Sequence, residues 1–298
     1  MPQISWCERV ETNVGKFGNV VAGIDPHLPD VPAAFDQDPN WISRYVDFVL
    51  ATIEGQVGFV KFQSAYFEAW GLAGMAALAS GIKKAKAAGM GVILDAKRGD
   101  IGPTATAYAR AYLTPAAAGG NADFEVDCIT VNPLMGPDTL QPFVACAKQF
   151  GKGLFVLCRT SNPGAGWLQD RIVDNHVVSD LLADLIASLA EECRHRSLSP
   201  IGAVVGATVP EEGRRLRRML PYSIILAPGL GPQGGDPTTI HALRGHSQAD
   251  LLVPVSRGLT RTEDRSMSLK LYSQLLLTRI AGFKSLVDCR ERQSSTQS

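Results

Sequence analysis

Three charged side chains stand close together after one short apolar run of the sequence. Residues 91–94 form a run of the length of a buried strand, and Asp95, Lys97 and Asp100 follow it. Because strand side chains alternate, Asp95 and Lys97 should project to the same side, while Gly99 lets the chain turn before Asp100. Two neighbouring carboxylates would keep the lysine protonated, which suits a proton donor better than a Schiff-base nucleophile. A bare D-x-K would more simply be an ion pair at a strand end, but the longer pattern D-x-K-x-x-D-I-x-x-T favours a catalytic site.

A second lysine, Lys61, interrupts the apolar run Val57–Phe62. Burying an ammonium group is costly unless an anion pairs with it, and the apolar neighbours on both sides argue against a lysine at a sheet edge. A neighbouring strand can bring Lys61 beside Asp95 without strain. We therefore expect a buried ion pair that joins two strand ends.

Other polar residues also stand where apolar runs end. Asp25, Asn132 and Ser161 follow the first, fourth and fifth runs. Each could simply cap a turn, because Asp, Asn and Ser are common turn residues, and for Asn132 a place in the site and a turn cap are equally weighted. His27 lacks a second histidine or carboxylate at ligand spacing, so we interpret it as structural and predict no metal site.

A glycine-rich segment, Ala227–Pro237, follows the seventh apolar run. Its four glycines and three prolines in eleven residues exclude regular structure. Glycines permit close approach of the backbone to phosphate, and barrel phosphate sites favour the loops after strands seven and eight. Arg257, directly after the eighth run, can hold a phosphate through two hydrogen bonds. The glycine-rich segment alone is weak evidence for a phosphate site, and Arg257 strengthens that prediction.

Eight apolar runs recur along the chain with helical segments between them. The runs lack polar alternation, as expected for strands covered on both faces, and are Asn19–Ile24, Val57–Phe62, Gly91–Leu94, Asp127–Val131, Gly153–Cys158, Ile201–Val205, Ser223–Leu226 and Leu251–Val255. Between the runs, apolar residues recur at the helical spacing of three and four positions, in segments such as Trp41–Glu54, Glu68–Ala88, Leu140–Phe150, Ser179–Arg194 and Glu211–Met219. The pattern predicts an α/β fold, a single-domain (β/α)8 (TIM) barrel over residues 1–298 with a frayed polar tail from about residue 290. An open doubly wound sheet is the alternative, and polar residues at the carboxyl ends of the runs favour the barrel.

The composition narrows the class of protein. With 45% hydrophobic and 19% charged residues the chain can bury a sizeable core, and its net charge of zero indicates neither a nucleic-acid nor a membrane partner. The six cysteines show no C-x-x-C pair or metal-finger spacing, and no stretch has the length of a signal peptide or a membrane span. We expect reduced cysteines and a cytoplasmic location.

The segment Asp95–Thr104 resembles the signature of the orotidine 5'-phosphate decarboxylase family, with every fixed position filled. The order of the other landmarks is similar to the longer bacterial (type 2) branch, and the likeness runs from about Asn19 to about Leu259. The resemblance implies decarboxylation of orotidine 5'-phosphate to UMP and carbon dioxide in pyrimidine biosynthesis, with neither cofactor nor metal.

The resemblance also implies a role for each candidate residue. The catalytic array would be Lys61, Asp95, Lys97 and Asp100, with Lys97 protonating the carbanion at C6 of the pyrimidine. The family's substrate contacts map onto Asp25 for a ribose hydroxyl, Ser161 for the pyrimidine, Gln233 for phosphate and base, Arg257 for phosphate, and Pro228 and Gly234 in the glycine-rich segment. In the family the second aspartate of the signature reaches across a two-fold interface. Asp100 and Thr104 would thus serve the partner subunit of a homodimer with shared active sites.

Other functions remain open from the sequence alone. A magnesium-dependent decarboxylase of sugar-acid phosphates in the same suprafamily shares the D-x-K-x-x-D strand end, and a Schiff-base aldolase could use the same barrel. A non-catalytic nucleotide-binding barrel is the alternative from another class. Two connections, Thr114–Ala122 and Trp167–His176, are longer than a compact family member needs, and the sequence assigns them no function.

Overall fold

The computed structural model describes residues 4–207, 210–230 and 237–288. Within these ranges eight parallel strands close into a barrel in the order β1-β10-β9-β8-β5-β4-β3-β2. They are β1 (Val20–Ile24), β2 (Phe59–Gln63), β3 (Gly91–Arg98), β4 (Cys128–Val131), β5 (Gly153–Arg159), β8 (Ser199–Val205), β9 (Ser223–Leu226) and β10 (Leu251–Val255). Each of these strands overlaps one of the eight apolar runs, and β3 continues past its run to Arg98. The barrel prediction is therefore confirmed, and the open-sheet alternative is wrong.

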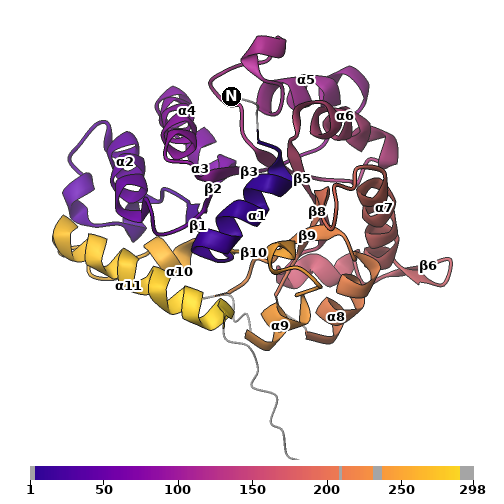
Figure 1. The fold of residues 1–298 in the computed structure, drawn as a ribbon. Coiled ribbons are helices and arrows are strands. Elements are labelled where there is room, and N and C mark those ends of the chain that lie inside the picture. Colours follow the sequence, from indigo (N-terminus) through magenta and orange to yellow (C-terminus); the bar gives the residue numbers. More distant parts are fainter. Residues whose placement is uncertain (1–3, 208–209, 231–236, 289–298) are drawn as a thin grey trace, which may run out of the picture.

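Helices surround the barrel, as Figure 1 shows. They are α1 (Trp6–Phe17), α2 (Trp41–Ile53), α3 (Ser64–Glu68), α4 (Gly71–Ala87), α5 (Gly102–Tyr112), α6 (Gln141–Phe150), α7 (Val178–Glu192), α8 (Pro210–Met219), α9 (Pro237–Ala242), α10 (Arg257–Thr260) and α11 (Leu269–Asp288). The five segments with helical periodicity coincide with α2, α4, α6, α7 and α8. No helix of the described ranges is long and apolar enough to cross a membrane.

The apolar side chains form two cores on opposite faces of the strands. The larger core fills the space between barrel and helices, with residues such as Val60, Leu94 and Val156. The smaller core fills the barrel interior, where Phe59 and Ile93 pack with residues of α1. Burial on both faces explains why the strands read as continuous apolar runs in the sequence.

Helix α1 covers one mouth of the barrel (Figure 1). The Trp6 ring meets the rings of Phe59 and Phe155 edge-on, with centroids 6.0 and 6.2 Å apart. Helix α1 is not among the helical segments predicted above. Its start was nevertheless marked in the sequence, because Ser5 as N-cap and Glu8 in the first turn form a capping box. Inward-facing aromatic residues of the strands and one capped helix thus close this end of the barrel.

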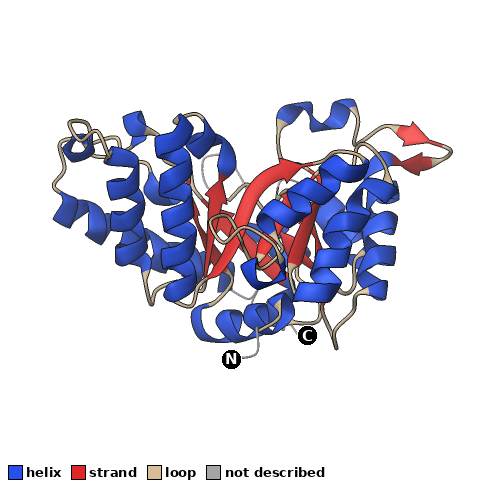
Figure 2. Ribbon diagram, turned by 90° about the horizontal axis from the view of Figure 1, so that it is seen from above, coloured by secondary structure: helices blue, strands red, loops and turns tan. Residues whose placement is uncertain are grey.

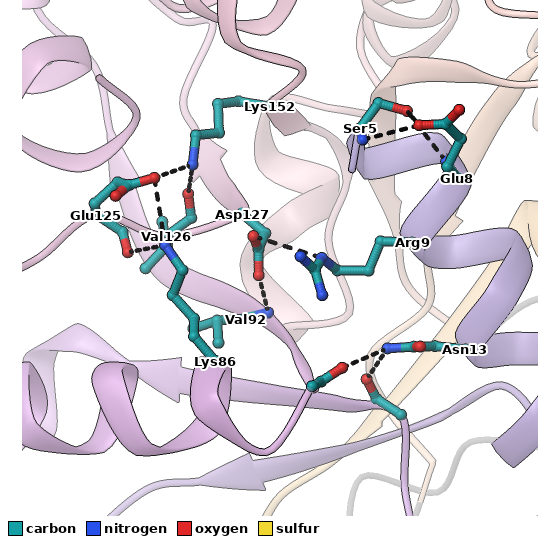
Figure 3. A network of polar contacts seen from close by, with 12 residues as sticks. Ser5, Glu8, Arg9, Asn13, Lys86, Val92, Glu125, Val126, Asp127 and Lys152 are labelled. Carbon is teal, nitrogen blue, oxygen red and sulfur yellow. Dashed lines mark hydrogen bonds and ion pairs between the residues drawn. The ribbon is translucent and has the colours of Figure 1, made fainter. Parts of the chain in front are cut away.

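Polar contacts fasten α1 to the amino ends of the strands (Figure 3). Arg9 pairs with Asp127 at 3.6 Å, and the same carboxylate accepts the N–H of Val92 at 2.8 Å. Asn13 donates to the carbonyl of Gly58, just before β2, at 2.8 Å. Within the described ranges, α1 closes this end of the barrel, and the carboxyl ends of the strands form its open side.

The two long connections lie on the surface. Thr114–Ala122 contains one 3-10 turn, Ala116–Ala118, while Trp167–His176 leads into an antiparallel hairpin of β6 (Ile172–Val173) and β7 (His176–Val177). This hairpin projects from the body of the molecule (Figure 2). The polar tail expected from about residue 290 lies outside the described residues.

Candidate active site

A pocket of about 880 Å³ opens at the carboxyl ends of the strands. Seven residues predicted from the sequence contribute to its lining, namely Asp25, Lys61, Asp95, Lys97, Ser161, Pro228 and Arg257. They come from the ends of six strands scattered through the chain, and closure of the barrel brings them together. Gln233 and Gly234 lie outside the described residues.

Strand alternation explains how charged groups enter this pocket from an apolar barrel. Phe59, Ile93 and Cys128 belong to the core inside the barrel. The residues two positions further along each strand face the same interior at the next level, and these are Lys61, Asp95 and Thr130. The polar layer of the site therefore rests directly on an apolar layer that excludes water from below.

Asp95 is the centre of the charged array. Its Oδ2 accepts a hydrogen bond from Lys61 Nζ at 3.0 Å, and its Oδ1 accepts one from Lys97 Nζ at 2.7 Å. Lys61 Nζ also lies 3.9 Å from Asp25 Oδ1. The array within one chain thus runs Asp25, Lys61, Asp95, Lys97 with alternating charge, and the predicted buried ion pair of Lys61 with Asp95 is present.

The pairing decides the ionisation of the buried members. Burial opposes the charge on Asp95, but the ammonium groups of Lys61 and Lys97 outweigh it, so the pKa of this carboxyl is lowered well below its usual range. Burial likewise opposes the charge on Lys61, and the carboxylates of Asp95 and Asp25 more than compensate, which raises its pKa. Both groups are therefore charged at neutral pH, and the pocket presents these charges on largely buried side chains.

Lys97 departs from regular strand geometry. Its φ of 49° lies in the left-handed region, and the register between β3 and β4 shifts between Leu94 and Arg98. The expectation that Asp95 and Lys97 lie side by side is right, but simple alternation is the wrong reason because a bulge separates them. The Lys97 side chain remains 45% exposed and opens toward the pocket, whereas that of Lys61 is 7% exposed. Only Lys97 of the two is placed to reach a ligand freely.

Asp100 and Thr104 do not join the array within one chain. Neither lines the pocket, and Asp100 accepts the backbone N–H of Ile101 at 2.8 Å. Among the described residues no ion pair within 4.0 Å reaches Asp100. Asn132 also stays out of the pocket lining and caps a turn by accepting the N–H of Leu134 at 3.0 Å.

The Ser161 segment is held by residues that the sequence did not single out. Gln169, from the unassigned connection after β5, accepts the N–H of Thr160 at 2.8 Å and donates to the Thr160 hydroxyl at 3.0 Å. Gly206 packs so closely on Ser161 that a Cβ there would lie 2.8 Å from the serine Cβ. The connection Trp167–His176 therefore contributes directly to the pocket, since Gln169 itself lines it. No sequence motif marks Gln169. It lies ten positions beyond Arg159, the last residue of β5, and lines the pocket because this connection folds back onto the strand end.

Thr130 was also missed. It lies against the array with 1% of its surface exposed, and its hydroxyl donates to Asp95 Oδ1 at 2.9 Å. In the sequence it reads as one more β-branched residue of a buried strand, which is the ordinary place for threonine. Its spacing of two from Cys128, on the inward face, was the available signal.

The barrel and this pocket define the class of the protein as a (β/α)8-barrel enzyme with a lysine–aspartate array at the carboxyl ends of its strands. Comparison with known proteins supplies the family. The model of the Orotidine 5'-phosphate decarboxylase / HUMPS family matches residues 20–272, and the chain belongs to this family.

Individual relatives agree with this assignment. The chain is 39% identical over 273 residues to the orotidine 5'-phosphate decarboxylase of Rhodopirellula baltica, covering 88% of this chain and 90% of the relative. It is 38% identical over 255 residues to that of Salinispora tropica, covering 85% and 88%. The solved structure of Leishmania donovani OMP decarboxylase superposes with a TM-score of 0.70 at 28% identity, covering 94% and 98% of the two chains.

Proposed function

We propose that the protein decarboxylates orotidine 5'-phosphate to UMP and carbon dioxide, the last step in making UMP. The observation that carries the proposal is the alternating array centred on Asp95, set in a pocket large enough for a nucleotide. A binding module gains nothing from a permanently charged carboxylate where the substrate also carries one. Family membership and relatives with this name support the same activity.

The pocket residues suggest how the substrate lies. Arg257 and Gly258, after β10, would hold the 5'-phosphate, and Asp25 would accept a hydrogen bond from a ribose hydroxyl. Among the described residues no hydrogen-bond partner reaches the buried Asp25 Oδ1, although Lys61 lies 3.9 Å away, so an acceptor is available there. Ser161 would contact the pyrimidine. This orientation directs C6 of the base toward Lys97.

The chemical step then follows from the charges. The bond between C6 and the carboxylate breaks, carbon dioxide leaves, and the electron pair stays on C6. The ammonium of Lys97 stabilises the developing carbanion and transfers one proton to C6, which yields UMP and a neutral amine that solvent reprotonates. Asp95 holds that ammonium at 2.7 Å and is buried and anionic before the substrate arrives. The charges that face C6 are thus in place before the carbanion develops, which is the advantage of a preorganised site.

One assay separates this function from the magnesium-dependent alternative. Loss of orotidine 5'-phosphate absorbance is followed with purified protein in excess EDTA, alongside a magnesium-supplemented sample. We expect equal rates in both. Turnover that appears only with magnesium, or none on this substrate in either sample, would contradict the proposal.

We further propose that the enzyme works as a homodimer with shared sites. Asp100 and Thr104 stand outside the pocket of their own chain. The segments that follow the neighbouring strands β2, β3 and β4 expose large apolar side chains, from 44% to 90% exposed, namely Trp70, Leu72, Ile101, Leu134 and Met135. An apolar rim beside the pocket mouth supports an interface at which Asp100 enters the partner's array.

Mixed dimers test the sharing. Inactive Lys97→Ala and Asp100→Ala chains are unfolded together and refolded, with exchange confirmed by a tag on one chain. Random pairing makes half the dimers hybrid, and two-fold symmetry then restores one complete site in each hybrid, so about a quarter of wild-type activity should return. If Asp100 serves its own chain, every site keeps a defect and mixing restores nothing. A cytoplasmic location stays a prediction of the sequence.

A further inference from the structure

The hydroxyl of Thr130 lies between the two working groups of the array. It accepts the backbone N–H of Lys97 at 2.9 Å and donates to Asp95 Oδ1 at 2.9 Å, and Lys97 Nζ bonds that same oxygen at 2.7 Å. One buried hydroxyl thus contacts Lys97 at its backbone and the carboxylate that holds its side chain. We propose that Thr130 is a positioning residue that fixes the catalytic geometry of Lys97.

The bulge in β3 explains why such a residue is required. On β4, Thr130 is the single residue between Ile129 and Val131, which pair with Leu94 and Arg98. Residues 95–97 of β3 therefore stand opposite one residue, and Lys97 takes a left-handed φ of 49°. A non-glycine residue rarely occupies this region and persists only where its surroundings hold it. The side chain of Thr130 supplies an acceptor for an N–H that the shifted ladder leaves out of register.

The same hydroxyl orients the carboxylate of Asp95. Asp95 Oδ2 is already taken by Lys61 at 3.0 Å, so the rotation of the carboxylate about its last bond is set by the donors on Oδ1. Without the hydroxyl, only the flexible ammonium of Lys97 would remain on Oδ1. The backbone N–H of Lys97 and the carboxylate of Asp95 would then each lose one hydrogen bond, and the Lys97 ammonium would sample positions away from C6.

This reasoning rests on the proposed role of Lys97 and makes a separate prediction about rate. Misplacing a reacting group by about 1 Å can cost about 10²-fold in rate. The phosphate and ribose contacts come from Arg257 and Asp25, which Thr130 does not bond. Loss of the hydroxyl should thus lower kcat and leave nucleotide binding in place.

Two substitutions of Thr130 distinguish the contribution of its hydroxyl from that of its methyl group. Thr130→Val keeps the shape and removes the hydroxyl, and Thr130→Ser keeps the hydroxyl and removes the methyl. We expect Thr130→Val to lower kcat about 10²-fold, with the Kd for UMP within twofold of wild type, and Thr130→Ser to remain within about fivefold of wild-type kcat. Thr139→Val is the matched control, because Thr139 is similarly buried and, in the part of the chain that the structure describes, its hydroxyl bonds only the carbonyl of Gly136. It should cost stability without lowering kcat.

The outcomes that overturn the proposal are distinct from failure of the proposed function. If Thr130→Val keeps more than half of wild-type kcat, or if Thr130→Ser falls as far as Thr130→Val, the hydroxyl does not position Lys97. A loss in UMP affinity equal to the loss in kcat would likewise make Thr130 a binding or purely structural residue. If the valine variant does not fold, Thr130→Ala is compared with Thr130→Ser by the same criteria. Lys97→Ala that retains turnover would instead refute the role of Lys97 itself.

Discussion

Substitution of Lys97 tests the chemistry most directly, and the structure allows its size to be worked out. General acid catalysis by one group contributes about 10²–10⁴-fold, and one charge aimed at the developing carbanion contributes about 10²–10³-fold. Lys97→Ala removes both, so kcat should fall by about 10⁴–10⁷-fold, or roughly 5–10 kcal/mol of transition-state stabilisation.

The same change should cost little stability. The Lys97 side chain is 45% exposed, and Asp95 keeps Lys61 and the Thr130 hydroxyl as partners after its removal. Partly exposed ion pairs contribute about 0–1 kcal/mol, so the variant should fold and its Kd for UMP should change little.

Lys97→Arg divides the loss into its two parts. Arginine keeps a positive charge beside Asp95 but does not release a proton in this pH range, so it retains the electrostatic part only. Single-turnover decay of orotidine 5'-phosphate absorbance with enzyme in excess measures all three proteins. We expect the order wild type, then Lys97→Arg, then Lys97→Ala, each separated by at least about 10²-fold. A Lys97→Ala variant that keeps a tenth of wild-type turnover, with UMP bound normally, would refute the mechanism.

Three further predictions concern binding, loop position and pH. Arg257→Ala should reduce kcat/KM for orotidine 5'-phosphate strongly and leave residual activity on the phosphate-free nucleoside nearly unchanged; an equal loss on both would mean that Arg257 does not act through phosphate. Gln169→Ala should weaken UMP binding and leave ribose 5-phosphate binding unchanged, because the Gln169 amide holds the segment of Ser161. Calorimetry of both ligands measures this, with the exposed Arg171→Ala as control, and an equal fall in both affinities would contradict it. Asp95→Asn should lower the free energy of unfolding by about 3–5 kcal/mol at about pH 7, since it leaves Lys61 with one distant anion. The folded-state pKa of Asp95 lies below its ordinary value of 3.8, so the stabilising contribution of Asp95 is present above that pH and is lost as pH falls. Urea titrations at about pH 3 should therefore show a smaller difference in the free energy of unfolding, and a difference that grows on acidification would oppose the assignment.

The barrel strands and the ion pair of Lys61 could be predicted from the sequence. Eight apolar runs predicted the eight strands because burial on both faces requires uninterrupted apolar residues. Lys61 could be assigned to an ion pair because a buried ammonium needs an anion, and the structure places Asp95 at 3.0 Å from it. The sequence determined these features because each depends on the physical chemistry of a few neighbouring residues.

Other features depend on chain segments far apart in sequence, and only the tertiary structure decided them. The bulge at Lys97 arises from the pairing of β3 with β4, and Thr130 becomes a site residue only because that pairing sets it against residues 95–97. Gln169 enters the pocket because its connection folds back onto the end of β5. Strand alternation predicts which face a side chain occupies, but the register between strands fixes which side chains meet. That register is set by packing of the whole barrel, so no local pattern in the sequence contains it.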